Sequence, residues 1–280
     1  AADRIAHAFV LTGVRGVGKT TTARIIARAL NCVGPDGAGG PTIEPCGECP
    51  NCVAIGQDRH VDVVEMDAAS NTGVNDVREL IDGARYRPVS ARYKIYIIDE
   101  AHMLSNNAFN ALLKTLEEPP PHEKFVFATT EVRKLPVTVL SRCQRFDLRR
   151  VPADALAKHF AAIAEKEAVA IETDALALIA RAADGSVRDG LSLLDQAIAL
   201  AGDGPATAAM CREMLGQADR AATFALLEAL LGGRPDAALK VFDSAMAAGV
   251  APGAALEDAL AAAHLVSRAL AAPKFLAAPA

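Results

Sequence analysis

The sequence predicts an α/β fold in which a doubly wound parallel sheet of five strands is followed by an all-helical half. Apolar, strand-like runs alternate with helical patterns over residues 1–150, an order typical of a parallel sheet with helices on both faces. From Pro152 onward the pattern is helical throughout, and its alanine-rich stretches favour helix. A glycine-rich loop, GVRGVGKT, joins the first predicted strand to the first predicted helix.

Composition narrows the class of protein. The chain has 280 residues, of which 51% are hydrophobic, so two or three domains with substantial cores are expected. The formal net charge of −5 argues against a surface that binds nucleic acid indiscriminately, although it leaves room for a local basic face. The sequence starts without a signal-peptide pattern and contains no apolar run long enough for a membrane span. We therefore expect a cytoplasmic protein without a membrane partner.

The first predicted elements are a short apolar strand, Ala8–Thr12, and a helix over about residues 20–30 with apolar positions on one face. The loop between them fits G-x-x-x-x-G-K-[ST], in which glycine lets backbone N–H groups approach a phosphate. The phosphate then lies at the helix N-terminus, where free N–H groups and the helix dipole favour an anion. A glycine-rich turn that binds nothing is the alternative. The predicted nucleotide-binding residues are Gly13, Gly16, Gly18, Lys19, Thr20 and Thr21.

The segment from Asn31 to Cys52 is rich in Gly and Pro and is predicted to be a loop. It contains a C-x-x-C-x-x-C pattern, with a fourth cysteine further upstream. Four thiolates in a hydrophilic insertion suit tetrahedral Zn²⁺, whereas disulfides or unrelated free thiols are the alternatives. Cys143 and Cys211 lie in apolar settings and are expected to be core residues. The predicted zinc module covers about residues 32–56, and its ligands are Cys32, Cys46, Cys49 and Cys52.

An acidic pair follows the third predicted strand. A second strand is expected over residues 61–66, a helix over about residues 74–84, and a third strand over the apolar run 95–98, which ends in Asp99 and Glu100. Ligands of parallel sheets bind at the carboxyl ends of the strands. Asp99 is therefore predicted to hold Mg²⁺, and Glu100 to orient and activate the attacking water. Two solvated carboxylates are the alternative.

Further elements complete both halves. Ser105 is expected to cap a helix that runs to about Glu118, and strands are expected over residues 124–130 and around residues 146–148. The helical half is expected to hold helices over about residues 152–166, 173–183, 186–201 and 206–215, with about three more after Gly216.

One arginine of the helical half conflicts with local electrostatics. Ser186 can cap a helix, and Arg188 lies in its first turn, where the helix dipole disfavours a cation. A nearby anion would resolve the conflict, so Arg188 is predicted to contact phosphate. An ordinary surface arginine is the alternative.

Several passages together resemble the gamma/tau subunits of the bacterial DNA polymerase III clamp loader, a family of AAA+ ATPases. The passages are HAFVLTGVRGVGKTTTARIIARALNC, the cysteine insertion, DAASNTGVNDVREL, YIIDEAHMLSNNAFNALLKTLEEPP, ATTEVRKLPVTVLSRCQRF and GSVRDGLSLLDQA. The resemblance implies an AAA+ P-loop ATPase domain with a zinc insertion over residues 1–150. It also implies an all-helical lid over residues 151–216 and a partial helical collar for oligomerisation over residues 217–280.

The resemblance assigns roles in the predicted nucleotide site. Lys19 matches the family's phosphate-binding lysine, and Thr20 matches its magnesium ligand. Asp99 and Glu100 match the Walker B pair. The implied cofactors are ATP, Mg²⁺ and Zn²⁺.

Three further positions match sensing or catalytic residues of the family. Thr130, and less closely Thr129, resembles sensor 1, which responds to the γ-phosphate, and Arg188 resembles sensor 2. Arg142 is similar to the arginine finger, which reaches into the neighbouring subunit's ATP site and stabilises charge during phosphoryl transfer. Glu100, Arg142 and Thr130 are thus the implied catalytic residues.

The resemblance implies an ATP-hydrolysing subunit that helps load the sliding clamp onto primed DNA during replication. The implied partners are other clamp-loader subunits in a hetero-pentamer, the sliding clamp and primer–template DNA. Relative to the family, the chain is expected to lack the segment that encloses the adenine, about half of the collar, and the tail that binds the polymerase core and the helicase. Candidates for DNA-backbone contacts, each with a solvated face as the alternative, are Arg85, Arg87, Arg92 and Lys94.

Two other functions stay open from the sequence. The first is a non-hydrolysing scaffold subunit of a replication complex, against which the intact P-loop and acidic pair argue. The second is another AAA+ DNA motor, such as a branch-migration motor. The zinc insertion and the element Ser141-Arg142-Cys143 disfavour it.

Overall fold

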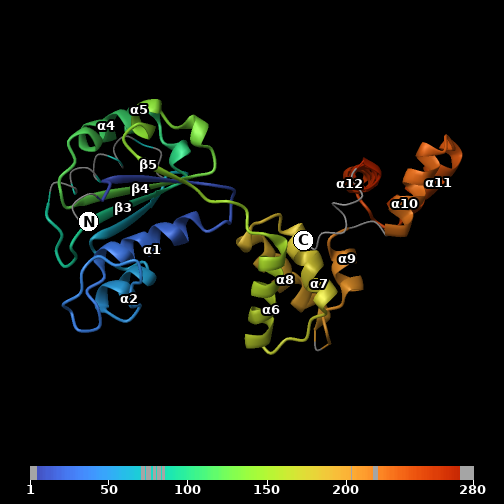
Figure 1. Cartoon of the computed structure of the whole chain (residues 1–280), viewed down its shortest axis with the longest axis horizontal. Coiled ribbons are helices and arrows are strands. Elements are labelled where there is room, and N and C mark those ends of the chain that lie inside the picture. The colour runs from blue at the N-terminus through green and yellow to red at the C-terminus, as the bar shows by residue number, and fades with distance from the viewer. Residues whose placement is uncertain are drawn as a thin grey trace. The chain divides into compact units, whose positions relative to one another are not determined.

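The computed structural model describes residues 5–70, 73, 77, 80, 83, 86–202, 204–216 and 220–271 (Figure 1). The chain divides into two compact units. Unit 1 comprises Ala1–Val151 together with Ser186–Arg188, and unit 2 comprises Pro152–Gly185 and Asp189–Ala280. The predicted boundary between a lid and a collar near residue 216 stays a prediction.

A five-stranded, all-parallel sheet forms the centre of unit 1, as the sequence predicts, with the order β2-β3-β4-β1-β5. The strand β2 begins two residues later than expected because the chain still turns at Asp62, whose backbone N–H donates to Nδ1 of His60. The edge strand β5 begins earlier than expected, and Leu148 follows it. The strands are β1 (Ala8–Thr12), β2 (Val63–Asp67), β3 (Lys94–Asp99), β4 (Glu123–Thr129) and β5 (Gln144–Asp147).

The helices of unit 1 mostly follow their sequence signals. Ser105 caps α4 as predicted, since its Oγ accepts a hydrogen bond from the backbone N–H of Ala108 at 3.2 Å. The predicted cysteine loop is interrupted by α2, because Cys49 acts as N-cap and Pro50 suits the first turn of a helix. The helix expected over residues 74–84 falls for the most part outside the described residues. The helical elements are α1 (Lys19–Asn31), α2 (Pro50–Gly56), η2 (Ala101–Met103), α4 (Asn106–Glu117), η3 (Val132–Lys134) and α5 (Val137–Leu140).

Helices cover the two faces of the sheet, with α1 on one side and α4 and α5 on the other (Figure 1). Successive residues of a strand point to opposite faces, so β3 contributes to both cores. Ile95 and Ile97 pack in the cluster that includes Ala27 of α1, whereas Tyr96 and Ile98 pack in the cluster that includes α4. Burial on both faces explains the unbroken apolar run of β3. Because the strands are parallel, the carboxyl ends of β1, β3 and β4 lie at one edge of the sheet.

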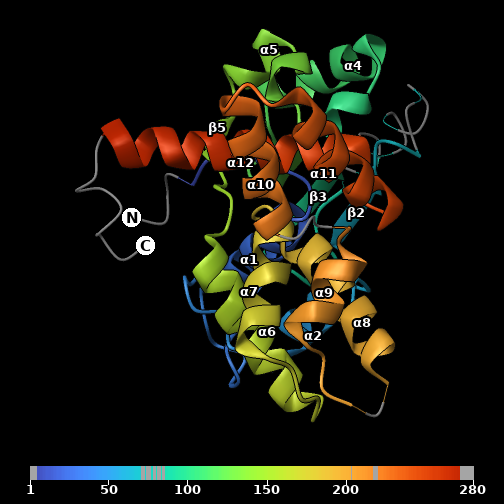
Figure 2. The same cartoon turned by 90° about the vertical axis from the view of Figure 1, so that its right-hand side faces the viewer.

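Within the described residues, every regular element of unit 2 is a helix, as the sequence predicts, and one isolated β-bridge joins Ile171 to Ala206 (Figure 2). In its first part, α8 approaches α6 closely, because a Cβ on Gly190 would meet the Phe160 ring at 2.2 Å. A second small core joins α10, α11 and α12 around Leu226 and Ala259. The helices are α6 (Ala153–Lys166), α7 (Thr173–Ala182), α8 (Val187–Ala201), α9 (Ala208–Met214), α10 (Arg220–Leu231), α11 (Pro235–Ala247) and α12 (Pro252–Ala271).

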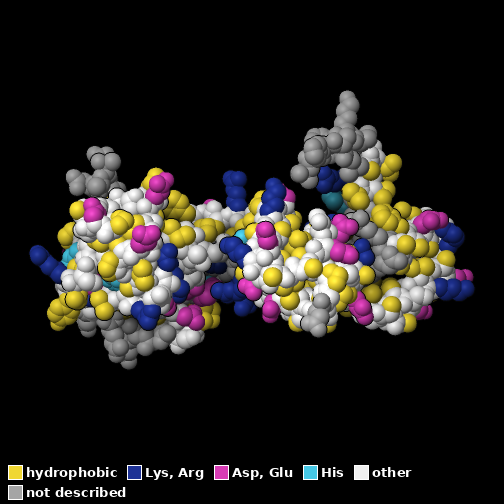
Figure 3. Space-filling view, turned by 90° about the horizontal axis from the view of Figure 1, so that it is seen from below, with side chains coloured by type: hydrophobic (Ala, Val, Ile, Leu, Met, Phe, Trp, Pro, Cys, Tyr) yellow, Lys and Arg dark blue, Asp and Glu magenta, His cyan; other side chains and the backbone are white. Residues whose placement is uncertain are grey.

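The surface carries charges of both signs. On the face that Figure 3 shows, Lys and Arg side chains are interspersed with Asp and Glu, in keeping with the net charge of −5. Among the residues that the structure describes, no helix has the length and apolar character that crossing a bilayer requires.

Candidate nucleotide site and cysteine cluster

The glycine-rich loop between β1 and α1 has the backbone geometry that its glycines allow. Gly16 and Gly18 have φ values of +71° and +96°, in the left-handed region that favours glycine. A Cβ on Gly13 would lie 2.7 Å from the backbone oxygen of Leu148, so this position has no room for a side chain. Gly18 is the N-cap residue of α1, and the helix begins at Lys19. The loop therefore leaves the N-terminus of α1 open, in the arrangement that binds a phosphate group.

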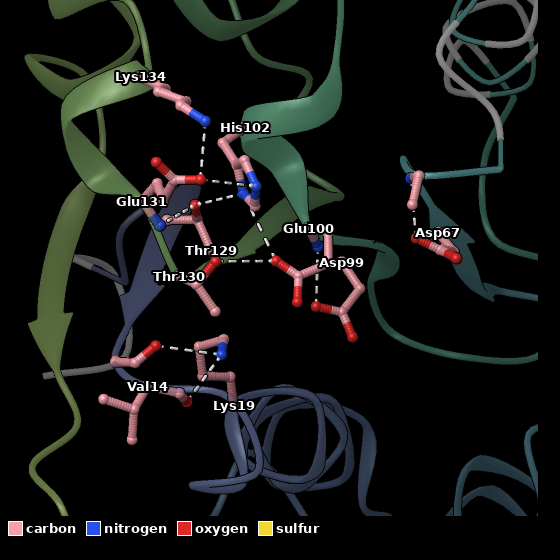
Figure 4. Close-up of polar contacts among 12 residues, drawn as sticks. Val14, Lys19, Asp67, Asp99, Glu100, His102, Thr129, Thr130, Glu131 and Lys134 are labelled. Carbon is pink, nitrogen blue, oxygen red and sulfur yellow. Dashed lines mark hydrogen bonds and ion pairs between the residues drawn. The ribbon is translucent and has the colours of Figure 1, made fainter. Parts of the chain in front are cut away.

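Lys19 is buried beneath the loop, and Figure 4 shows its ammonium group pointing back to the loop carbonyls. Its Nζ donates to the backbone oxygens of Gly13 at 3.2 Å and Val14 at 3.0 Å. Burial lowers the pKa of Lys19, and the nearby carboxylates Glu100 and Asp99 offset part of this shift. An ammonium group that is largely desolvated is ready to bind an anion such as phosphate.

Thr20 and Asp99 meet at the carboxyl edge of the sheet. Thr20 Oγ1, on the first turn of α1, donates to Asp99 Oδ2 at the end of β3 with a separation of 2.5 Å. These residues are 79 positions apart in sequence, so the fold itself brings their oxygens together. Hydroxyl and carboxylate oxygens are the ligand types that Mg²⁺ prefers, and the pair therefore fits that cation. Thr21 is exposed on the next position of α1.

Glu100 lies directly after β3 in an unusual backbone conformation. Its φ of 45° and ψ of 43° are left-handed, which is uncommon for a residue with a Cβ and often marks functional sites. Its backbone N–H donates to Asp99 Oδ1 at 2.8 Å. Thr130, directly after β4, donates through Oγ1 to Glu100 Oε2 at 3.3 Å (Figure 4). The predicted Walker B glutamate and the predicted sensor threonine thus contact each other through a hydrogen bond.

Three residues that the sequence did not single out complete this cluster. His102 Nδ1 lies 3.1 Å from Thr129 Oγ1 and 3.4 Å from Glu100 Oε2, and its Nε2 lies 3.5 Å from Glu131 Oε1. Lys134 donates to Glu131 Oε1 at 2.7 Å, and this bond lowers the pKa of the exposed Glu131 carboxyl. The sequence signal available for this cluster was a histidine, His102, two positions after Glu100.

Arg188 belongs to unit 1, together with Ser186 and Val187, whereas the rest of α8 from Asp189 onward belongs to unit 2. The backbone N–H groups of Val187 and Arg188 donate to the Gly16 oxygen at 3.0 and 3.4 Å. A Cβ on Gly16 would also meet Ser186 Oγ at 2.1 Å, so glycine is needed here for a second reason. The positive charge of Arg188 contributes to lowering the pKa of Lys19. Two cations held close together favour an anion between them, which supports the predicted phosphate contact.

Arg142 follows α5 and is engaged within its own chain. Its Nη2 pairs with Glu117 Oε1 at 2.7 Å, and its Nη1 donates to the backbone oxygen of Thr138 at 2.7 Å. These partners belong to α4 and α5. The role of Arg142 in a neighbouring subunit stays a prediction, because it concerns an assembly.

The four predicted zinc ligands converge. The Sγ atoms of Cys32, Cys46, Cys49 and Cys52 all lie within 4.8 Å of one another. Zn–S bonds of about 2.3 Å in a tetrahedron place sulfur atoms about 3.8 Å apart, and Cys32 Sγ lies 3.6 Å from Cys46 Sγ. The structure holds all six cysteines as free thiols. The donor set and its spacing therefore fit a zinc ion.

Backbone N–H groups stabilise thiolates in this cluster. Those of Cys46 and Gly34 lower the pKa of Cys32. Burial would raise the pKa of Cys49, but the N–H groups of Val33 and Cys52 outweigh it and lower that pKa to about 6. Burial raises the pKa of Cys52 to about 12, and the negative charge of the Cys49 thiolate adds to this shift. Two thiolates side by side lack a countercharge. A divalent cation would supply that countercharge.

The other two cysteines pack among apolar groups, as predicted. Cys211 is buried, and Cys143 is half-buried against the core of unit 1. Burial raises the pKa of both thiols. Neither belongs to the cysteine cluster.

Two of the basic residues considered for DNA contacts have hydrogen-bond partners within the chain. Arg92 donates through Nη1 to the backbone oxygen of Leu30 at 2.7 Å and through Nη2 to that of Gly39 at 2.9 Å. Lys94 donates to the backbone oxygen of Gly83 at 2.7 Å. Arg92 therefore fastens the cysteine loop to the end of α1. Arg87 is exposed, and Arg85 lies outside the described residues.

The fold and the nucleotide site define a protein of the AAA+ P-loop class. Among solved structures, the Thermotoga maritima RuvB Holliday junction branch migration motor aligns with a TM-score of 0.53 over 81% of this chain and 68% of that chain. At 18% identity, this likeness shows the fold alone.

Three family models cover nearly the whole chain. The model for the DNA polymerase III delta subunit matches residues 1–152. The model for the ATPase lid domain of DNA polymerase III clamp loader subunits matches residues 155–203, and that for domain III of the gamma and tau subunits matches residues 206–279.

Curated relatives point to the same family. The DNA polymerase III subunit tau of Salmonella typhimurium is 46% identical over 264 residues, covering 94% of this chain and 40% of that protein. Subunit tau of Bacillus subtilis is 50% identical over 200 residues, covering 71% of this chain and 35% of that protein. The chain belongs to the gamma/tau family of DNA polymerase III clamp-loader subunits. It spans less than half the length of these two relatives.

Proposed function

We propose that this chain is an ATP-hydrolysing clamp-loader subunit that helps load the sliding clamp onto primed DNA. The observation that carries the proposal is the contact of Thr20 with Asp99 beside the buried Lys19. A hydroxyl, a carboxylate and an ammonium group at one end of a glycine-rich loop form the arrangement that a nucleoside triphosphate and its magnesium ion require. The family to which the chain belongs supports the same assignment.

In this proposal, the loop residues bind the phosphates. The backbone N–H groups that Gly13, Gly16 and Gly18 leave accessible donate hydrogen bonds to the phosphate oxygens, and Lys19 neutralises the charge of these oxygens. Thr21, on the exposed side of the first turn of α1, extends this contact. Thr20 and Asp99 would hold Mg²⁺, which would offset further phosphate charge when bound.

The remaining site residues act on the reacting atoms. Glu100 orients the attacking water through its carboxylate, and Thr130 holds that carboxylate and responds to the γ-phosphate. Arg188 contacts phosphate from the first turn of α8. Arg142 acts as an arginine finger in the ATP site of an adjacent subunit, where its guanidinium stabilises charge that develops in the transition state.

The cysteine cluster is proposed to bind Zn²⁺ in a structural role. All four of its thiols serve as ligands, so the coordination shell is closed and leaves no open position for chemistry. The ion would fasten the segment between α1 and α2.

The proposed partners are other clamp-loader subunits in a hetero-pentamer, the sliding clamp and primer–template DNA, with the polymerase core and the helicase binding through a tail. Residues 151–216 act as the lid and residues 217–280 as the collar in this scheme. Exposed leucines on the last three helices suit a subunit interface, among them Leu231, Leu239, Leu260 and Leu270. The expected cytoplasmic location stays a prediction.

The proposal is tested by ATP turnover in a mixture of this chain with the companion subunits, the clamp and primed DNA. Glu100→Gln should lower turnover at least about 100-fold, because the amide is a far weaker base toward the attacking water. Binding of ADP to the variant should be unchanged. Glu213→Gln, which changes an exposed glutamate of α9, is the matched control and should retain full turnover.

Two outcomes would contradict the proposal. Glu100→Gln with full turnover would show that another residue activates the water. Wild-type chain that binds nucleotide but never turns it over in the complete mixture would instead identify a scaffold subunit.

A further inference from the structure

His102 occupies a central place in the site without a role in the scheme above. It lies on η2, directly after the strand that carries Asp99 and Glu100, and its side chain is only 8% exposed. Figure 4 shows the imidazole ring between the Glu100 carboxylate and the segment that carries Thr129 and Glu131. A buried polar ring between two functional segments must be hydrogen-bonded, and its partners define what it does.

One ring nitrogen reaches the glutamate that is proposed to activate water. His102 Nδ1 lies 3.4 Å from Glu100 Oε2 and 3.1 Å from Thr129 Oγ1. A proton on Nδ1 is therefore directed at the region between these two oxygens. Thr129 is fully buried, and its Oγ1 already accepts the backbone N–H of Glu131 at 3.0 Å. The threonine thus offers the ring a rigid reference point at the end of β4.

The other ring nitrogen is anchored outside the nucleotide site. His102 Nε2 lies 3.5 Å from Glu131 Oε1, and the same oxygen accepts a hydrogen bond from Lys134 Nζ at 2.7 Å. Each ring nitrogen thus faces a carboxylate, Nδ1 that of Glu100 and Nε2 that of Glu131. Rotation of the ring would break both sets of contacts at once, so its orientation is fixed from two directions.

These contacts constrain one oxygen of Glu100 and leave the other available. Within the described residues, Thr130 Oγ1 and His102 Nδ1 both approach Oε2. Oε1 is then the oxygen that can accept a proton from an attacking water. A glutamate side chain has several rotatable bonds, so without these contacts its carboxylate would sample many positions.

We propose that His102 is a positioning residue that holds the Glu100 carboxylate in the orientation required to activate water. This inference rests on the proposed ATP hydrolysis. His102 connects the strand end of β3, through Glu100, to the strand end of β4, through Thr129. A small displacement of a catalytic group costs a large factor in rate, while it leaves nucleotide binding intact.

The test compares three substitutions in the full chain, assayed with the companion subunits, the clamp and primed DNA. His102→Ala removes both nitrogens. His102→Asn keeps Cβ and Cγ and places an N–H donor at the position of Nδ1, whereas His102→Gln places its donor near the position of Nε2. The kcat and KM for ATP are measured, together with the dissociation constant for ADP and the thermal unfolding midpoint of each variant.

The expected result separates catalysis from binding. His102→Ala should lower kcat about tenfold, with KM and the ADP dissociation constant within about twofold of wild type. His102→Asn should recover most of the lost kcat, and His102→Gln should not. A merely structural role would lower the unfolding midpoint in all variants without this order of kcat values. If the alanine variant does not fold, the Asn and Gln pair still decides.

The inference is overturned by a kcat of His102→Ala within about twofold of wild type, by equal kcat values for the Asn and Gln variants, or by losses that appear in KM alone. Failure of the proposed function looks different. In that case the wild-type chain itself shows no turnover, or Glu100→Gln leaves turnover unchanged.

Discussion

At the scale of single residues, Asp62 shows how one buried carboxylate determines the course of a loop. It is fully buried just before β2. Its oxygens accept backbone N–H groups from Val89, Ser90 and Ala91, each at 2.8 Å, and the Ser90 hydroxyl at 3.3 Å. Burial alone would raise the pKa of Asp62, but these donors outweigh it, and the pKa is lowered. The segment that leads into β3 is thereby fixed, and with it the position of the strand that carries Asp99.

Replacing Asp62 should destabilise unit 1. Asp62→Ala leaves three backbone N–H groups without the carboxylate that accepts them and should lower the free energy of unfolding by about 2–4 kcal/mol, whereas Asp62→Asn keeps one acceptor and should cost less. Urea unfolding measures both. Asp58→Asn is the matched control, because that exposed aspartate makes only a surface ion pair with Arg24. Equal stability of Asp62→Ala and wild type would contradict the prediction.

The contribution of Asp62 should also depend on pH. Its folded-state pKa is lower than its unfolded value of about 3.9, so the contribution is fully present above that value. It is lost as the pH falls toward the folded-state pKa. The stability difference between wild type and Asp62→Asn should therefore be constant at neutral pH and shrink below about pH 4. A difference that grows on acidification would contradict this sign.

The site residues also show what a sequence can and cannot reveal. Lys19, Thr20 and Asp99 were predictable because each follows from a motif or from the polar end of an apolar strand. His102 and Glu131 were not, because their importance depends on the tips of β3 and β4 lying side by side. That pairing is a property of the strand order, which local patterns do not encode. The Arg92 contacts with Leu30 and Gly39 were hidden for the same reason.

At the scale of elements, segments with a strong local signal were predicted well, and a segment without one was missed. The helix α4 and the strand β1 have strong local signals, a serine cap and a continuous apolar run. The short helix α2 was missed, because its N-cap is a cysteine whose Sγ accepts the N–H of Cys52. Cysteine is not among the usual capping residues, so composition indicated a loop throughout.

Loss of the proposed zinc ion should loosen this part of unit 1. Cys46→Ser should reduce the zinc content of the chelator-free protein from about one equivalent to less than half. Amide exchange should then accelerate in α2, whose first turn is organised by the cysteine cluster. Cys143→Ser is the control, since that thiol is remote from the cluster, and it should retain the metal. Wild-type protein without zinc by metal analysis would refute the assignment.

At the scale of the whole molecule, the proposed function depends on an assembly. Arg142 is tied to α4 and α5 of its own chain through Glu117 and Thr138. Its side chain is 33% exposed, so part of it remains available to another subunit. If a neighbour completes the site, turnover should be low in the isolated chain and higher in the complete mixture.

Arg142→Ala should therefore separate binding from assembly-dependent turnover. The isolated variant should bind ADP as the wild type does, because its own P-loop is unchanged. In the complete mixture its turnover should fall at least about 100-fold, since the transition-state charge loses a guanidinium. Arg145→Ala, which removes an exposed arginine paired with Asp147, is the matched control. Weaker ADP binding by the isolated Arg142→Ala chain would contradict a role in a neighbouring site.

The hydrogen bonds from the Val187 and Arg188 N–H groups to the Gly16 oxygen have a consequence for mutagenesis. Ser186 and the first two residues of α8 belong to unit 1, while the chain on either side of them belongs to unit 2. Because the link consists of amides and one carbonyl, most side-chain replacements leave it intact. Replacing the amide of Val187 by an ester would remove one of the two hydrogen bonds to the Gly16 oxygen and leave every side chain as it is.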